Sequence, residues 1–130
     1  MNKKEQLLKI EKRFIEAGIK YYSEPVLRCR QLDRVIGPDF CVFNKVTGEK
    51  FVWLHFIDMS NKEYLDNVFW PKFREYNQLG FVMGINMIVT CEKEEDPITD
   101  EEIDDFIYRF LLTESKDERS VMTMASLGLG

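Results

Sequence analysis

The chain has 130 residues, of which 45% are hydrophobic and 13% aromatic, and its formal net charge is −5. This length suits one domain with a single core, and this composition excludes a wholly disordered protein. The apolar runs are too short to span a membrane, and the lysine-rich start lacks the apolar core of a signal peptide. We therefore expect a soluble, cytoplasmic protein that has no membrane partner.

The cysteines indicate thiols in the core rather than a disulfide framework or a zinc site. The chain has three, Cys29, Cys41 and Cys91, without a Cys-x-x-Cys pair and with a single histidine. Two of them lie in apolar, strand-like runs, where a thiol behaves as a small hydrophobe. We expect all three to be reduced.

The first third of the chain predicts a helix followed by two short strands. Asn2 and Glu5 have the spacing of a capping box, apolar residues follow at helical spacing, and Gly18 ends the helix. Residues 19–22 and 26–30 then predict two extended segments, which a turn-forming Ser-Glu-Pro sequence separates.

The middle of the chain predicts a hairpin and a second helix. Residues 35–43 and 49–58 are rich in β-branched and aromatic side chains, and turn formers join them. Ser60 or Asn61 then caps a helix. Pro71 interrupts the helical pattern, which predicts a kink or two abutting pieces.

The last third predicts a buried strand, a helix and a tail. Residues 85–91 form a compact β-branched run, and Thr99 followed by acidic residues starts a helix. Strand, helix and strand over 49–91 make one parallel crossover unit. The sequence thus predicts a single α/β (α+β) domain over 1–112, with a mixed β-sheet flanked by helices. Residues 113–130 predict a flexible tail.

Charge is distributed unevenly along the chain. Residues 1–34 carry nine Lys and Arg against five Asp and Glu, whereas residues 92–105 carry nine acidic residues against one lysine. The overall acidity argues against a broad electrostatic grip on nucleic acid. An acidic run is usually a solvated surface, and the alternative is a docking surface for a basic protein partner. The candidate binding residues are Asp100, Glu101, Glu102, Asp104 and Asp105.

Asp39 stands directly after Gly-Pro, at the start of the first hairpin strand. Carboxylates on neighbouring strands can converge on Mg²⁺ or Mn²⁺, which activates water for phosphodiester hydrolysis. The plain alternative is that Asp39 caps a turn. Period-two alternation puts Leu54 and His55 on opposite faces of the second strand, which favours a core or boundary histidine over a catalytic base.

Several short motifs follow one another along the chain in an order that is typical of one protein superfamily. The chain reads Tyr-Ser-Glu-Pro-Val-Leu at 22–27, Pro-Asp-Phe at 38–40 and Val-Trp-Leu-His-Phe at 52–56, followed by Lys72, Tyr76 and Gly80. This series resembles the PD-(D/E)xK, or restriction-endonuclease-like, nuclease superfamily. In a branch of that superfamily the corresponding motifs are Tyr-Glu-x-Pro-Leu, Pro-Asp-Phe and Tyr-Trp-Glu-His. The resemblance covers about residues 5–112 and implies a restriction-endonuclease-like fold.

The resemblance implies that Asp39 is a metal ligand and, in an active enzyme, a catalytic residue together with Lys72 near the scissile phosphate. The strand glutamate of the family falls at Leu54, however, and leucine cannot ligate a hard cation. Glu24 is the candidate replacement ligand if its strand runs beside Asp39. Unless the fold brings it over Asp39, Lys72 is a solvated helix lysine.

Three functions remain open. The first is a catalytically inactive nuclease-like domain that binds a basic, nucleic-acid-handling protein, by analogy with phage and mobile-element inhibitors that mimic DNA and block host defence systems. The second is an active Mg²⁺- or Mn²⁺-dependent DNA endonuclease or exonuclease with rearranged ligands. The third is an accessory subunit that binds DNA weakly through the basic first helix. We favour the first, which needs no cofactor, because of Leu54 and the acidic surface.

Overall fold

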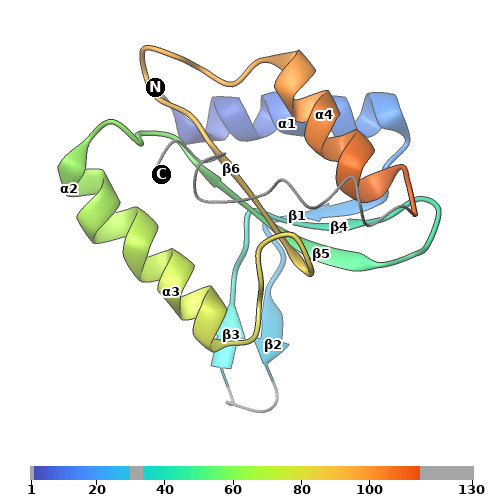
Figure 1. Ribbon diagram of the computed structural model, residues 1–130, viewed down its shortest axis with the longest axis horizontal. Coiled ribbons are helices and arrows are strands. Elements are labelled where there is room, and N and C mark those ends of the chain that lie inside the picture. The colour runs from blue at the N-terminus through green and yellow to red at the C-terminus, as the bar shows by residue number, and fades with distance from the viewer. Residues whose placement is uncertain (1, 30–33, 115–130) are drawn as a thin grey trace.

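The computed structural model describes residues 2–29 and 34–114 (Figure 1). The helices are α1 (Lys3–Ala17), α2 (Lys62–Tyr64), α3 (Trp70–Gln78) and α4 (Asp100–Leu111), with a π-helical segment η2 (Leu65–Phe69) between α2 and α3. The strands are β1 (Tyr21–Ser23), β2 (Leu27–Cys29), β3 (Arg34–Ile36), β4 (Phe40–Phe43), β5 (Lys50–Phe56) and β6 (Met87–Cys91). Apart from its first two residues, the predicted tail lies outside the described residues.

The predicted class, a mixed sheet flanked by helices, is confirmed. The main sheet has the strand order β1-β4-β5-β6, in which β5 and β6 are parallel and the other neighbours are antiparallel. Helices α1 and α4 cover one face of this sheet, and α2, η2 and α3 cover the other (Figure 1). None of the helices in the described ranges is long and apolar enough to cross a membrane.

Helix α1 forms where its caps predict. The side chain of Asn2 accepts a hydrogen bond from the backbone N–H of Glu5, at 3.4 Å. Gly18 ends the helix at φ 70°, a left-handed conformation that glycine adopts without steric cost. Leu7, Ile10 and Phe14 form the buried stripe and pack into the first core cluster, between α1, α4 and the sheet.

The strand predicted over residues 35–43 is wrong as one element, because it breaks at Gly37-Pro38-Asp39. Strand β3 pairs with β2 in a separate two-stranded sheet, and only β4 enters the main sheet and forms the hairpin with β5. Proline explains the break, because Pro38 has no N–H for a sheet hydrogen bond and its ring fixes φ. The break leaves Asp39 at the mouth of β4 instead of within a continuous strand.

The second helix is interrupted as predicted. Asn61 is its cap, since its side chain accepts a hydrogen bond from Tyr64 N at 3.2 Å. Segment η2 then widens the helix before Pro71, which lies in the first turn of α3. Because proline lacks an N–H, the first turn is where a helix tolerates it. Phe69, Phe73 and Tyr76 of η2 and α3 pack onto the sheet and close the second core cluster.

Candidate functional site

Asp39 and Leu54 lie opposite each other on the face of the main sheet that η2 and α3 cover. Phe40 pairs with Trp53 in the β4–β5 ladder, so the next position along β5 opposite Asp39 is Leu54. Asp39 is 7% exposed, and Leu54 is fully buried in the second core cluster. The hairpin therefore sets the carboxylate and the leucine at neighbouring positions, where the family resemblance implies two acidic residues.

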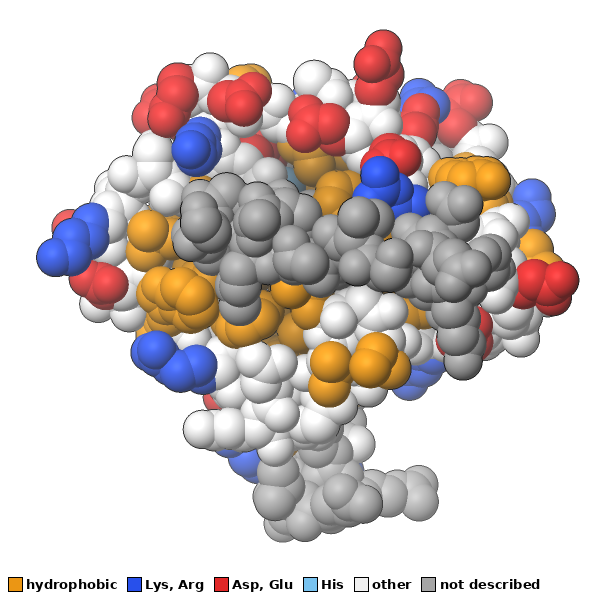
Figure 2. Space-filling view, in the orientation of Figure 1, with side chains coloured by type: hydrophobic (Ala, Val, Ile, Leu, Met, Phe, Trp, Pro, Cys, Tyr) orange, Lys and Arg blue, Asp and Glu red, His pale blue; other side chains and the backbone are white. Residues whose placement is uncertain are grey.

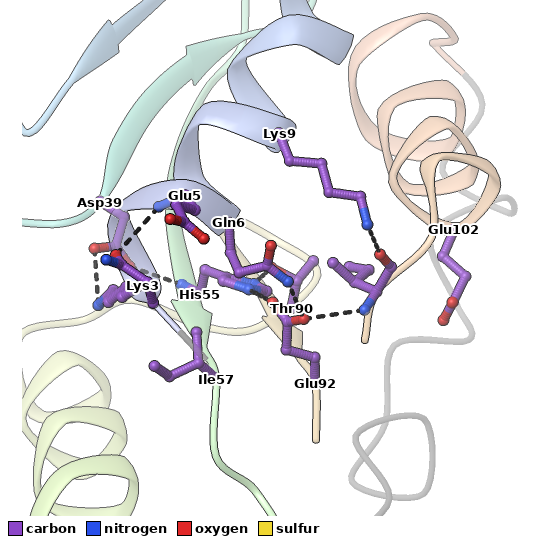
Figure 3. A network of polar contacts seen from close by, with 12 residues as sticks. Lys3, Glu5, Gln6, Lys9, Asp39, His55, Ile57, Thr90, Glu92 and Glu102 are labelled. Atoms are coloured by element: carbon purple, nitrogen blue, oxygen red, sulfur yellow. Dashed lines mark hydrogen bonds and ion pairs between the residues drawn. The ribbon is translucent and has the colours of Figure 1, made fainter. Parts of the chain in front are cut away.

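Both oxygens of the Asp39 carboxylate have protein partners (Figure 3). Oδ2 accepts a hydrogen bond from the backbone N–H of His55 at 2.8 Å. Oδ1 lies 3.0 Å from the Nζ of Lys3, which reaches down from the first turn of α1. An ammonium group thus stands beside the oxygen to which a divalent cation would bind.

Lys72 lies on α3 within electrostatic range of Asp39. Burial lowers the pKa of Lys72, the charge of Asp39 acts to raise it, and the charge of Lys3 lowers it further. Two lysines from opposite sides of the sheet therefore share the field of one carboxylate. In the described part of the chain, no ion pair joins Lys72 to an acidic side chain within 4.0 Å.

Glu24, the candidate replacement ligand, lies beside Asp39 through its backbone. Strand β1 pairs with β4, and the N–H of Glu24 donates to the carbonyl oxygen of Asp39 at 2.8 Å. The residue has a positive φ of 47° and is exposed. No group of three or more His, Cys, Asp or Glu side chains that could hold a metal occurs within residues 2–29 and 34–114. The described donor set does not fit a Mg²⁺ or Mn²⁺ site, which needs several converging oxygen ligands.

The other face of the sheet holds a buried polar network that sequence reasoning missed (Figure 3). His55 is fully buried, as its parity predicts, and its Nδ1 lies 2.7 Å from Thr90 Oγ1. Its Nε2 contacts the Oε2 of Glu92, which is 3% exposed. Thr90 Oγ1 also accepts from Trp53 Nε1 at 2.9 Å. The residues alternate along β6 and its continuation, so Thr90 and Glu92 share the face on which His55 lies.

Glu92 joins three further parts of the molecule. Its Oε1 accepts hydrogen bonds from Gln6 Nε2 of α1 at 2.6 Å and from the backbone N–H of Ile98 at 3.1 Å. Burial alone raises the pKa of Glu92, but the hydrogen bond and charge of His55, with the bonds from Ile98 and Gln6, outweigh burial and lower it. The network is enclosed, so its arrangement of hydroxyl, imidazole and carboxylate holds the fold together and is closed to substrate.

The acidic run is divided between structure and surface. Glu92 at its start is buried, which corrects the view of the run as wholly solvated. Of the candidate binding residues, Glu102 completes the capping box with Thr99, and Asp104 accepts two hydrogen bonds from Arg13, each at 2.8 Å. Asp105 pairs with Arg109 at 2.9 Å.

Asp100 and Glu101 are exposed at the start of α4. Acidic side chains gather along the edge that α1, α4 and the segment before α4 form (Figure 2). The structure thus places all five candidate residues on helix α4, and it leaves Asp100 and Glu101 without an ion pair among the described residues.

The cysteines agree in part with the prediction of core thiols. Cys41 is buried and Cys91 is half-buried, and both are free. Burial raises the pKa of the Cys91 thiol to about 12, so this group is not a nucleophile at neutral pH. The side chain of Cys29 lies outside the described residues.

Comparison with known proteins adds no family. No protein-family model matches the chain, and neither a curated protein nor a solved structure matches it significantly. The function must therefore be argued from the residues themselves.

Proposed function

We propose that this protein is a catalytically inactive nuclease-like domain that acts by binding a basic, nucleic-acid-handling protein. The observation that carries the loss of catalysis is the contact between Lys3 Nζ and Asp39 Oδ1, at 3.0 Å. A carboxylate that already has an ammonium and a backbone N–H as partners has little capacity left for a hard cation.

The position opposite Asp39 supports the same conclusion. Leu54 is fully buried among apolar side chains, so neither its chemistry nor its surroundings suit a metal ligand. Two-metal and one-metal nucleases both need cations to activate water and to neutralise the developing charge on phosphate. One carboxylate, already paired, is a poor basis for either mechanism.

A cleavage assay tests the loss of catalysis. Wild type, Asp39→Ala and the double variant Lys3→Met/Leu54→Glu are incubated with single- and double-stranded DNA in Mg²⁺ and in Mn²⁺, after circular dichroism has shown that each is folded. We expect no cleavage by wild type or by Asp39→Ala. Cleavage or Mn²⁺ binding that appears only in the double variant would support a preserved frame without its ligands.

The alternative function, an active DNA endonuclease or exonuclease, predicts the opposite result. The backbone contact between Glu24 and Asp39 favours it, because it brings a second acidic residue to the site. Metal-dependent cleavage by wild type that both Asp39→Ala and Glu24→Gln remove would establish this alternative and sink the proposal of a catalytically inactive domain.

The binding half of the proposal rests on the charge at the start of α4. Asp100 and Glu101 are exposed and have no ion pair among the described residues, so their charges are available to a partner. Such rim charges mainly steer association and make it sensitive to salt. A basic protein is the partner class that this surface fits, because like-charged nucleic acid would be repelled.

An arginine-rich peptide serves as the probe of this surface, with fluorescence anisotropy as the readout. We expect binding by wild type that weakens as salt rises, and a clear loss of affinity in Asp100→Asn/Glu101→Gln. The matched control is Glu63→Gln/Asp66→Asn, which removes the same charge from exposed positions beneath the other sheet face. Equal losses in both variants would show a response to net charge alone and would contradict a docking surface on α4.

A further inference from the structure

A groove of about 400 Å³ lies between strand β3 and helix α3, beside Asp39 and on the sheet face opposite α4. Its lining residues come from strand β3 and its continuation on one side and from η2 and α3 on the other. Figure 1 shows the ribbons of β3 and α3 next to each other. This volume falls within the range of small-molecule sites in proteins. The residues that matter to the argument are Val35, Ile36, Val68, Pro71, Lys72 and Glu75.

Among the described residues around the groove, one cation, Lys72, has no ion pair of its own. Glu75 Oε2 lies 2.5 Å from Arg34 Nη2, and Asp39 is paired with Lys3. The charges of Asp39 and Glu75 both act to raise the pKa of Lys72, but each of these carboxylates has its ion pair with another cation. Lys72 is half-buried and, in the described ranges, has no ion pair, whereas cations removed from water are usually paired.

The lining of the groove beside Lys72 mixes accessible apolar side chains with polar ones. Val35 and Val68 are 63% and 41% exposed, one on each wall, and Pro71 lies next to Lys72 in the chain. Small-molecule sites combine such apolar walls with a few placed polar groups that fix orientation. The groove thus offers a contact for an apolar body and a single positive charge for an anionic head.

We propose that this groove binds a small organic monocarboxylate, with the carboxylate on Lys72 and the apolar part between Val35 and Val68. One cation that has no ion pair among the described residues matches a monoanion. The net charge of −5 on the whole chain disfavours a polyanion such as nucleic acid. The carboxylate belongs either to a free acid or to the C-terminus of a peptide. This site is independent of the proposed partner surface, because it lies under the other face of the sheet.

The test titrates ¹⁵N-labelled protein with benzoate and follows backbone amide shifts by NMR. Benzyl alcohol, which has the same ring without the charge, is the ligand control. We expect saturable shifts at residues 35–37 and 67–76 with millimolar benzoate and none that saturate with benzyl alcohol. Lys72→Met is expected to weaken binding about tenfold or more, because it removes a charge-assisted hydrogen bond. Lys72→Arg and the exposed-lysine control Lys62→Met are expected to retain it.

Further experiments identify the source of the carboxylate and define the results that would overturn the proposal. A peptide that ends in a leucine carboxylate, compared with its amidated form, distinguishes a protein terminus from a free acid. Absence of saturation with both benzoate and the peptide would overturn the proposal, as would equal binding by wild type and Lys72→Met. Inorganic phosphate or a short oligothymidylate that binds more tightly than benzoate would overturn the assignment of a carboxylate.

Discussion

Within residues 2–29 and 34–114 the buried carboxylates are Asp39 and Glu92, which lie on opposite faces of the main sheet and have different kinds of partner. Asp39 sits at a rim, and its charged partner, Lys3, has a side chain that is 36% exposed. Glu92 is enclosed, and its partners come from α1, β5 and the segment before α4. The sequence motif Pro-Asp-Phe marks Asp39 as a candidate site residue, whereas Glu92 lies in an acidic run and has no motif of its own. From this difference in partners we expect the fold to depend more on Glu92 than on Asp39, although Asp39 has the stronger sequence motif.

The largest expected effect is the loss of Glu92. Glu92→Ala leaves the buried His55 ring and Ile98 N–H and the half-buried Gln6 amide without their acceptor, so we expect a loss of about 3–5 kcal/mol in the free energy of unfolding. Urea denaturation measures it. Glu94→Ala, in the same acidic run but exposed, is the control and should change stability by less than about 0.5 kcal/mol. A cost below about 1 kcal/mol for Glu92→Ala would end the claim that the network supports the fold.

The pH dependence of the free energy of unfolding should report the ionisation of Glu92, whose pKa His55 and the other partners lower. Because the pKa of Glu92 is lower in the folded than in the unfolded state, its contribution is fully present above the unfolded value of about 4.3. It is lost as the pH falls through the folded-state pKa. Urea titrations between neutral and acidic pH should therefore show wild type approaching Glu92→Gln as the pH falls. A gap between the two that stays constant would exclude this linkage.

Asp39→Ala is expected to cost less, about 1–3 kcal/mol, because it leaves the His55 N–H without an acceptor. Asp39→Asn keeps an oxygen that can accept from this N–H, so its cost should be smaller. Thermal denaturation of both variants measures the difference. An equal loss of stability in Asp39→Ala and Glu92→Ala would contradict the expectation that the fold depends more on Glu92.

The smallest effect is expected for Lys3→Met. Partly exposed ion pairs contribute little, so we expect a loss below about 1 kcal/mol in urea denaturation. Lys4→Met, one residue further on and exposed, is the matched control. If Lys3→Met lowers the free energy of unfolding as much as Asp39→Ala does, the ion pair with Lys3 accounts for most of the stability that Asp39 contributes.

Local signals predicted most of the secondary structure. Asn2, Gly18 and Thr99 mark helix ends through hydrogen bonds and backbone angles that need no tertiary context. The hairpin of β4 and β5 and the parallel strand β6 also follow from local pattern and connection length. The break at Pro38 was missed because apolar residues continue on both sides of it.

The candidate site was predicted in part. The effect of the Asp39 charge on Lys72 and the contact of Asp39 with Lys3 both depend on how α3 and α1 dock on the sheet, which one sequence does not specify. The role of Glu92 was missed because its neighbours are acidic and exposed. A signal was present in the period-two relation between Thr90 and Glu92, but it gains meaning only when the register between β5 and β6 is known.

The side chain of Asn44 has a consequence for the order in which this chain folds. Its Oδ1 accepts from Val46 N and Thr47 N, so half of its bonds are available as soon as the turn is made. Its Nδ2 donates to the carbonyl oxygens of Phe110 and Thr113, which follow 66 and 69 residues later. During synthesis on a ribosome the hairpin turn can therefore form early. The hydrogen bonds from Asn44 Nδ2 to the end of α4 can form only after nearly the whole domain has emerged.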